Sequence, residues 1–220
     1  MTNFIHLPID PKEFGRWCGL RGLDDQDLAM HTLVTGLFGR QVLQPFRYYE
    51  SAHGASIYGY ARQTGSELQD MIALTATPDV SKVISGPIAA KQLPALRNGA
   101  RIGFEIRITP VRRKGSAQRD AHDVDLAMNS GRSREESYQA WFSERMGEAA
   151  EIEAFRVAKY ARTRTRRNGK TITLSDAVFQ GTLSITDAKN FDEILSNGIG
   201  RQKSYGYGML LLRPADPATN

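Results

Sequence analysis

The sequence predicts an α+β protein made of two tandem domains of similar construction. In the first half, runs with strand and helix periodicity follow one another in the order strand, helix, strand, strand, helix, strand. The same order repeats in the second half, after residues 91–99, which lack a strong period. The 220 residues suffice for two domains of about a hundred residues each. This βαββαβ order is typical of ferredoxin-like (RRM-like) domains, which we expect at residues 1–95 and 96–220.

The elements of the first half alternate as this fold requires. After a first short strand, Asp24 or Asp25 caps a helix whose apolar residues recur at helical spacing until Gly39 ends it. Two β-rich runs then form a hairpin, a second helix follows, and the last strand is weak because Gly86-Pro87 interrupts it. The expected strands are residues 4–7, 46–50, 57–61 and 83–88, and the second helix is 67–74.

The second half repeats the pattern with stronger signals. Ser133 and Glu136 form a capping box at the start of its first helix. Asn168-Gly169 lies between two β-rich runs and predicts a tight hairpin. Residues 112–132 are polar and show no regular period. The expected strands are residues 101–111, 156–167, 171–183 and 209–212, and the helices are 133–146 and 187–196.

Charge and cysteine content limit the class of protein. The formal net charge of +5 favours an acidic partner. The single cysteine, Cys18, excludes an internal disulfide and a cysteine-based zinc site, and it suits a reducing cytosol. The first residues lack the basic and apolar segments of a signal peptide, and no window is as apolar as a membrane span. We therefore expect a cytoplasmic protein with no membrane partner.

Residues 198–208, GIGRQKSYGYG, form the most distinctive stretch, which we call the glycine loop. Glycine permits positive φ and leaves no Cβ in the way, so successive N–H groups can face one anion while the two cations add full charge. The loop follows a helix and precedes a strand, which does not fit Walker or Rossmann loops, because both open a helix. We predict a phosphate-binding loop; the alternative is a flexible turn with incidental charge. Its candidate binding residues are Gly198, Gly200, Arg201, Lys203, Gly206 and Gly208.

A basic hairpin is the second distinctive feature. Arg162, Arg164 and Arg166 alternate with threonines, so a strand places the three guanidinium groups on one face at intervals of about 6.6 Å. Residues 156–170 hold seven basic side chains and no acidic one. Such a ribbon suits the phosphates of an RNA duplex better than a single strand, because it lacks interleaved aromatic residues. The alternative is a solvated basic face. Arg167 and Lys170 extend the candidate RNA-binding set.

Three stretches resemble the CasE family of CRISPR repeat endoribonucleases. They are residues 179–214, which contain the glycine loop, the strand FEIRITPVRR and the helix segment MHTLVTGLF. The resemblance implies two ferredoxin-like domains in tandem. It implies cleavage of precursor CRISPR RNA at the base of the repeat hairpin, without a metal or other cofactor. It also implies that the protein stays on its product, with other Cas subunits, in a Cascade-like effector complex.

The resemblance implies a chemistry as well. The RNA's own 2′-hydroxyl attacks the adjacent phosphorus and leaves a 2′,3′-cyclic phosphate. His31 aligns with the family's catalytic histidine, and an imidazole transfers protons near neutral pH. Arg40 and Lys203 are candidates to stabilise the extra charge of the phosphorane, with Arg16 or Arg21 as alternatives. The histidines are scattered and no carboxylates cluster, so no metal site is expected.

The sequence departs from the family beside His31. Members of the family carry a tyrosine three residues before the histidine and can carry a lysine five residues after it, where this chain has Leu28 and Gly36. A related branch, the repeat-processing subunits of type IV systems, relies on arginines and lacks a catalytic histidine. Two further alternatives are a subunit that holds the CRISPR RNA hairpin without efficient cleavage and an unrelated tandem RRM-like RNA-binding protein. The latter would carry aromatic RNP submotifs, of which GFEIRITPV is only a loose match.

Overall fold

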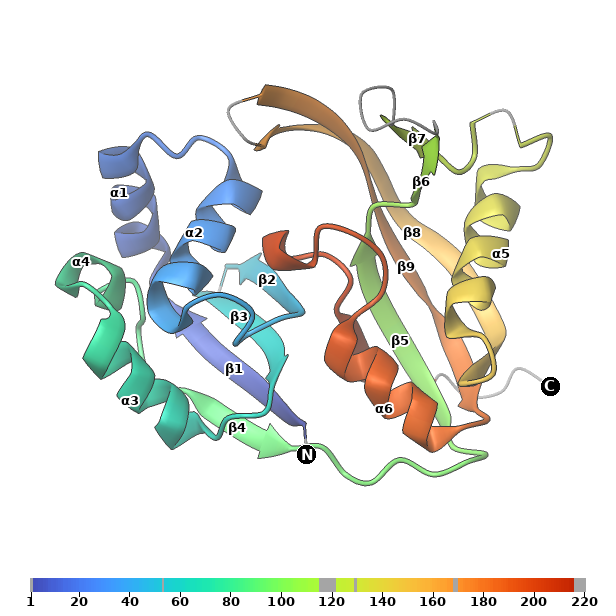
Figure 1. Cartoon of the computed structure of the whole chain (residues 1–220), viewed down its shortest axis with the longest axis horizontal. Helices are drawn as coiled ribbons and strands as arrows, with labels where there is room; N and C mark the ends of the chain where they lie inside the picture. The colour runs from blue at the N-terminus through green and yellow to red at the C-terminus, as the bar shows by residue number, and fades with distance from the viewer. Residues whose placement is uncertain (1, 53, 115–121, 129, 168–169, 216–220) are drawn as a thin grey trace.

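Two four-stranded antiparallel sheets lie side by side, and helices cover one face of each (Figure 1). The computed structural model describes residues 2–52, 54–114, 122–128, 130–167 and 170–215; for Lys114, His122, Arg166, Arg167 and Lys170 it describes the backbone alone. We call the elements up to β4 the first domain and those from β5 the second domain. Each contains the order βαββαβ with added elements, so the predicted α+β class with two ferredoxin-like units is confirmed.

The first sheet has the strand order β2–β3–β1–β4, with every neighbouring pair antiparallel. Helices α2 and α3 close its apolar face, where Ile5, Leu7 and Leu33 are fully buried. The strands are β1 Asn3–Ile9, β2 Phe46–Ser51, β3 Gly54–Ala61 and β4 Ala89–Gln92. The helices are α1 Pro11–Arg21, α2 Gln26–Phe38, α3 Gly65–Thr75 and α4 Pro78–Ser81.

The second sheet has the corresponding order β10–β5–β9–β8. Helices α5 and α6 pack on it, and Phe104, Phe142 and Phe179 form the centre of its core, each fully buried. The strands are β5 Arg101–Ile108, β8 Ala150–Arg167, β9 Lys170–Ile185 and β10 Leu210–Arg213. The helices are α5 Arg134–Met146, α6 Ala188–Asn197 and the short 3₁₀ turn η1 Lys203–Tyr205.

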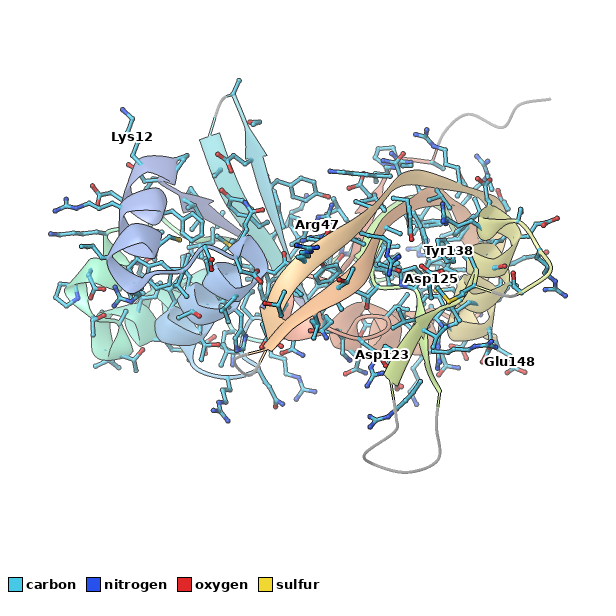
Figure 2. All side chains as sticks on the ribbon, turned by 90° about the horizontal axis from the view of Figure 1, so that it is seen from above. Lys12, Arg47, Asp123, Asp125, Tyr138 and Glu148 are labelled. Carbon is cyan, nitrogen blue, oxygen red and sulfur yellow. The ribbon has the colours of Figure 1, made fainter. Side chains whose placement is uncertain are left out.

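The hairpin of β8 and β9 is much longer than the rest of its sheet. The two strands pair from Ala150 with Ile185 to Arg167 with Lys170, which confirms a two-residue connection at the predicted position. Seen from above, the hairpin crosses from the second domain towards the first (Figure 2). Near its tip the Thr165 hydroxyl donates a hydrogen bond to Asp25, the residue that caps α2. The hairpin is therefore attached to the same helix that carries His31.

Helix and hairpin predictions agree with the structure, but one strand prediction is wrong. Residues 83–88 do not form a strand; Val83 and Ile88 fill the core from irregular backbone, and Ile84 makes only an isolated bridge to Ile9. The fourth strand is β4, whose residues are all exposed, so its sequence shows no alternation. Helix α1 was not predicted, because only Phe14 and Trp17 of its eleven residues are buried.

A two-stranded ribbon interrupts the second domain where the sequence looked irregular. Strands β6 Val111–Lys114 and β7 His122–Asp125 pair with each other. Asp125 accepts hydrogen bonds from the hydroxyls of Tyr138 on α5, at 2.8 Å, and of Ser175 on β9, at 2.5 Å. Figure 2 shows Asp125 and Tyr138 close together at the base of this ribbon. One half-buried carboxylate thus fixes the ribbon to both the helix and the sheet.

Candidate functional site

His31 projects from α2 at the boundary between the two domains. Asp25 caps the helix through its side chain, which accepts from the N–H of Leu28 at 3.0 Å. Met30, Leu33 and Val34 are buried in the first core, which leaves the adjacent His31 half-buried at the edge of that face. The helix thereby presents the imidazole to the glycine loop of the second domain, which lies next to it in Figure 1.

The glycine loop holds the imidazole on two sides. His31 Nδ1 lies 2.9 Å from the backbone carbonyl oxygen of Ser204, and the His31 ring stacks on Tyr205 with the centroids 4.4 Å apart. A carbonyl oxygen only accepts hydrogen bonds, so Nδ1 must carry a proton to make this contact. In the neutral ring Nε2 is then the unprotonated nitrogen, which is the form that accepts a proton. Neither Ser204 nor Tyr205 was singled out in the sequence.

The glycines of the loop serve its folding, which corrects part of the prediction. The N–H groups of Gly198, Gly206 and Gly208 donate to backbone carbonyls of Ile194, Lys203 and Arg107, so they are not available to an anion. All four glycines have positive φ. A Cβ on Gly208 would lie 2.3 Å from the Ile199 carbonyl oxygen. Of these four glycines, Gly200 is the one whose N–H group donates to no residue that the structure describes.

A buried ion cluster fixes the loop against α2. Arg107 Nη1 lies 2.9 Å from Asp27 Oδ1, and Arg107 Nη2 lies 2.6 Å from Asp176 Oδ2. The Tyr207 hydroxyl donates to Asp27 Oδ2 at 2.8 Å and accepts from Arg107 Nη2 at 2.8 Å. Asp27 precedes His31 by one helical turn, so the cluster determines where the histidine lies. In the sequence, Arg107 is part of the strand FEIRITPVRR and Asp27 is an acidic residue near the start of its helix, and neither position indicates a cluster between the domains.

The electrostatics of this cluster favour a permanently charged guanidinium. Burial alone would lower the pKa of Arg107, but the hydrogen bonds to Asp176 and the charge of Asp27 outweigh it, so the pKa is raised. Burial also raises the pKa of Tyr207, with the Asp27 carboxylate adding to the shift. Tyr207 therefore stays neutral and acts as a hydrogen-bond donor. Arg107 and Tyr207 therefore both serve as structural hydrogen-bond donors to the carboxylates.

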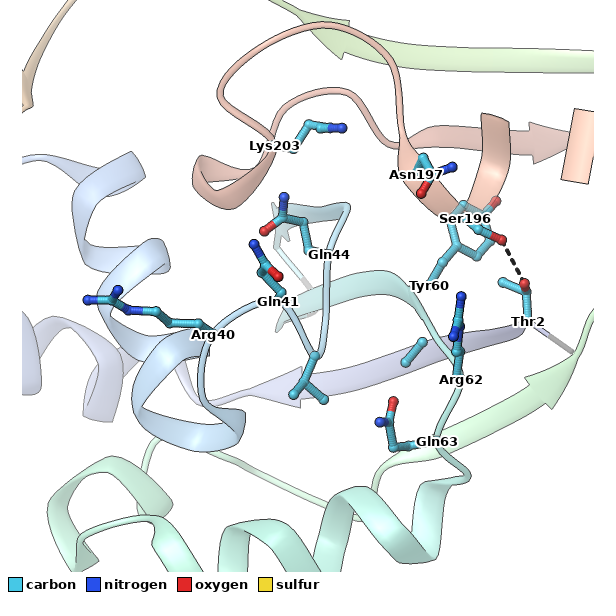
Figure 3. Close-up of a pocket in the computed structure, with 12 residues that line it drawn as sticks. Thr2, Arg40, Gln41, Gln44, Tyr60, Arg62, Gln63, Ser196, Asn197 and Lys203 are labelled. Atoms are coloured by element: carbon cyan, nitrogen blue, oxygen red, sulfur yellow. Dashed lines mark hydrogen bonds between the residues drawn. The ribbon is translucent and has the colours of Figure 1, made fainter. Parts of the chain in front are cut away.

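Two adjoining pockets bring the predicted catalytic residues together. One, of about 360 Å³, is lined by His31, Ser204 and Tyr205. The other, of about 450 Å³, is lined by Lys203 and lies between the domains (Figure 3). Arg40, Gln41 and Gln44, which follow α2, line both. His31 and Lys203 thus line neighbouring pockets and Arg40 lines both, whereas Arg16 and Arg21 line neither pocket.

The basic hairpin presents its arginines as the alternation predicted. Arg162 and Arg164 are exposed, whereas the intervening Thr163 is half-buried and Thr165 is buried. The side chains of Arg166, Arg167 and Lys170 lie outside the described part of the structure. Arg201 of the glycine loop differs, because its guanidinium pairs with Asp123 of β7. The hairpin arginines are therefore open to a ligand, and Arg201 is engaged within the protein.

Across the described residues, no group of three or more histidine, cysteine, aspartate or glutamate side chains is placed to hold a metal ion. Within the same residues, no helix has the length and apolar character needed to span a membrane.

Comparisons with known proteins agree with the fold. The model of the family described as CRISPR associated protein matches residues 4–214. The Cascade subunit CasE of Escherichia coli (strain K12) is 28% identical over 146 residues, 64% of this chain and 72% of that protein. The crystal structure of Cas6e from Escherichia coli K-12 superposes with a TM-score of 0.63 at 19% identity, covering 97% of this chain and 100% of that one. The CRISPR endoribonuclease Cse3 bound to a 19-nucleotide RNA gives 0.69 at 18%, covering 97% and 99%.

Proposed function

The chain belongs to the family of CRISPR associated proteins, and from this premise we propose that it is an endoribonuclease that processes precursor CRISPR RNA. It cuts at the base of the repeat hairpin without a metal and stays on the product as a subunit of a Cascade-like complex. Support comes from its relatives: one is named a Cascade subunit, and a protein of the same fold is named an endoribonuclease and is bound to RNA. The protein acts in the cytoplasm in this proposal.

In the proposed reaction, the 2′-hydroxyl oxygen attacks the adjacent phosphorus while His31 Nε2 accepts the hydroxyl proton. The bond from phosphorus to the 5′-oxygen breaks, and that oxygen takes a proton from water. The products are a 2′,3′-cyclic phosphate and a 5′-hydroxyl. Arg40 and Lys203 stabilise the additional negative charge of the phosphorane. One observation carries this proposal: the Ser204 carbonyl fixes the imidazole with Nδ1 protonated, which leaves Nε2 to act as the base.

The hairpin and the glycine loop supply binding in this proposal. Arg162 and Arg164, continued by Arg166, Arg167 and Lys170, contact the phosphates of the RNA stem. In the loop, Lys203 and the N–H of Gly200 contact the RNA, while Gly198, Gly206 and Gly208 maintain the loop shape and Arg201 supports it through Asp123. Contacts made equally with substrate and product slow dissociation without accelerating the chemical step. We therefore expect one turnover per enzyme, followed by very slow release.

The test is cleavage of the repeat RNA of the protein's own locus in EDTA. We expect the wild-type protein to cut it, and His31→Ala to lower the single-turnover rate by about 10² to 10⁴ with little change in affinity. His6→Ala is the matched control, since the His6 ring is hydrogen-bonded to the Ser56 hydroxyl on β3 and lines neither pocket. A 2′-deoxy group at the cut site should block the reaction. Unchanged rates for His31→Ala, or cleavage of the deoxy substrate, would contradict this mechanism.

A second candidate function follows from the residues around His31. Leu28 and Gly36 provide no side chain able to transfer a proton, and the free cations nearby are arginines and a lysine. In this alternative the protein holds the CRISPR RNA hairpin and cleaves it slowly, or through Arg40 instead of His31. Tight binding of the repeat without cleavage by the wild-type protein would favour the first form. Cleavage that survives His31→Ala but not Arg40→Ala would favour the second.

A further inference from the structure

The larger of the two pockets contains more polar groups than the proposed reaction uses. It lies between the end of α2, the end of β3 and the C-terminus of α6, so both domains contribute (Figure 3). Its volume, about 450 Å³, is in the range of sites that hold one small molecule. Three cations and four carboxamides line it, and no carboxylate does. These residues are Arg40, Arg62, Lys203, Gln41, Gln44, Gln63 and Asn197.

The three cations are not neutralised by the protein. Arg40, Arg62 and Lys203 form no ion pair with any carboxylate that the structure describes. Arg107 of β5 and Arg201 of the glycine loop, by contrast, are both paired. Arg40 and Arg62 are exposed and Lys203 is half-buried, so each can pair with an anion that enters from solution. The pocket therefore favours a phosphate or another anionic group.

The four carboxamides are equally uncommitted. The side chains of Gln41, Gln44, Gln63 and Asn197 form no hydrogen bond with another described residue. Each carboxamide offers two donors and an acceptor, the combination that pairs with the polar edge of a base. A phosphate needs donors alone, so the amide oxygens indicate a ligand that also has N–H groups. Phosphate and base edge together describe a nucleotide.

The backbone around this pocket is unusual as well. Among the described residues, Gln41 and Gln202 are the two non-glycine residues with positive φ, at 66° and 61°. Gln41 lines the pocket, and Gln202 precedes Lys203, which also lines it. A left-handed conformation at a non-glycine residue costs free energy, and such residues cluster at ligand sites. The chain accepts this cost at two of the segments that line the pocket.

We propose that this pocket binds the unpaired nucleotide joined to the cleaved phosphate, with the cations on its phosphate and the carboxamides on its base. The proposal rests on the proposed function, since it places the cut beside His31. Arg40, Gln41 and Gln44 line both this pocket and the His31 pocket, so an RNA strand bound at His31 has this pocket beside it. The single-stranded flank of the repeat is thereby held, and one base beside the cut is recognised.

The base contacts are tested by binding measurements on four RNAs. These are the repeat hairpin with its flanks, two versions of that RNA with an abasic site on one or the other side of the cut, and the bare stem. The wild-type protein should bind the flanked RNA about tenfold more tightly than one of the two abasic RNAs. The double variant Gln44→Ala, Gln63→Ala should bind the flanked RNA about tenfold more weakly than the wild-type protein does. Its affinity for that same abasic RNA should equal that of the wild-type protein. Gln69→Ala, an exposed glutamine on α3, is the control.

The phosphate contact is tested through the salt dependence of binding. Arg62→Ala should lower the slope of log affinity against log salt by about one unit on the flanked RNA and leave it unchanged on the bare stem. Lys82→Ala, an exposed cation next to α4, should leave both slopes unchanged. Equal thermal midpoints for all variants would show that folding is not responsible.

Failure of this proposal differs from failure of the proposed function. Should flanked, abasic and bare RNAs bind equally well to a wild-type protein that still cleaves, the nucleotide pocket is wrong and the nuclease stands. If the wild-type protein binds the flanked RNA more tightly than the others but does not cleave it, the nucleotide pocket is supported and the endoribonuclease function is wrong. Loss of affinity for the bare stem in Gln44→Ala, Gln63→Ala would also overturn the proposal, because it would place the stem here.

Discussion

The two segments proposed to bind RNA, the glycine loop and the β8–β9 hairpin, are constructed in opposite ways. In the loop, the N–H groups of Gly198, Gly206 and Gly208 and the side chain of Tyr207 are committed to internal contacts, and the Tyr207 hydroxyl reaches the other domain. In the hairpin, a regular ladder carries Arg162 and Arg164, which extend into solvent. A substitution in a segment that packs against the core, such as the loop, therefore disturbs the whole site. A segment whose ligand-binding groups project from a ladder can be altered one side chain at a time.

The ion cluster that anchors the loop should show the largest effect. Arg107→Met leaves the carboxylates of Asp27 and Asp176 buried without their cation, and we expect the free energy of unfolding to fall by about 3 kcal/mol. Arg101→Met is the matched control on the same strand, because its ion pair with Glu153 is half exposed and contributes little. Chemical denaturation of both variants is the measurement. Equal losses would mean that the cluster does not anchor the loop.

The close packing of the loop should show the next largest effect. Gly208 and Gly99 have nearly equal φ, 78° and 80°, but a Cβ on Gly208 would meet Ile199 O at 2.3 Å and one on Gly99 would meet nothing within 4 Å. Gly99→Ala therefore measures backbone strain alone, about 1 kcal/mol. Gly208→Ala should cost about 1 to 2 kcal/mol more, since its backbone must also move. Gly208→Ala should slow cleavage too, and identical behaviour of the two variants would contradict the steric argument.

Sequence reasoning succeeded where the decisive contacts are local. The cap at Asp25, the capping box of Ser133 and the alternation around Arg164 involve neighbours in the chain, and all three are found in the structure. It failed where partners are distant. The N–H of Gly208 is used by Arg107, about a hundred residues earlier, and a glycine pattern looks the same whether its N–H groups face a ligand or the protein.

Only part of the candidate site could be predicted from the sequence, again because distant partners leave no local pattern. His31, Arg40 and Lys203 come together around two adjoining pockets, although their roles stay predictions. The carboxamides of Gln44 and Gln63 were missed, because single polar residues in separate loops form no sequence pattern. Their uncommitted state is visible only when the whole set of contacts is known. The β4 strand was misplaced because an exposed edge strand buries neither face.

The contact between the loop and the histidine should show a smaller effect. Tyr205→Ala removes the ring that stacks on His31, a contact typically worth about 1 kcal/mol. The imidazole then keeps its bond to Ser204 but has more rotational freedom, so we expect cleavage to slow by up to about tenfold with the hairpin affinity unchanged. Tyr205→Phe retains the ring and should restore the rate. If Tyr205→Phe is as slow as Tyr205→Ala, the hydroxyl rather than the stacking matters.

The hairpin arginines should show the smallest effect on the fold and a selective effect on binding. Arg162 and Arg164 are exposed, so replacing both with alanine should change the free energy of unfolding by less than about 0.5 kcal/mol. If each contacts one phosphate of the stem, the slope of log affinity against log salt should fall by about two units for the hairpin RNA. Thr163→Ala lies on the same strand but projects to the other face, and it should leave the slope unchanged.

Because the loop and His31 are untouched in the double variant, bound RNA should still be cut at the wild-type rate at saturating protein. A full salt slope in the double variant would mean that the stem is held elsewhere, and a slower cut at saturation would mean that the hairpin, through Thr165 and Asp25, also positions α2.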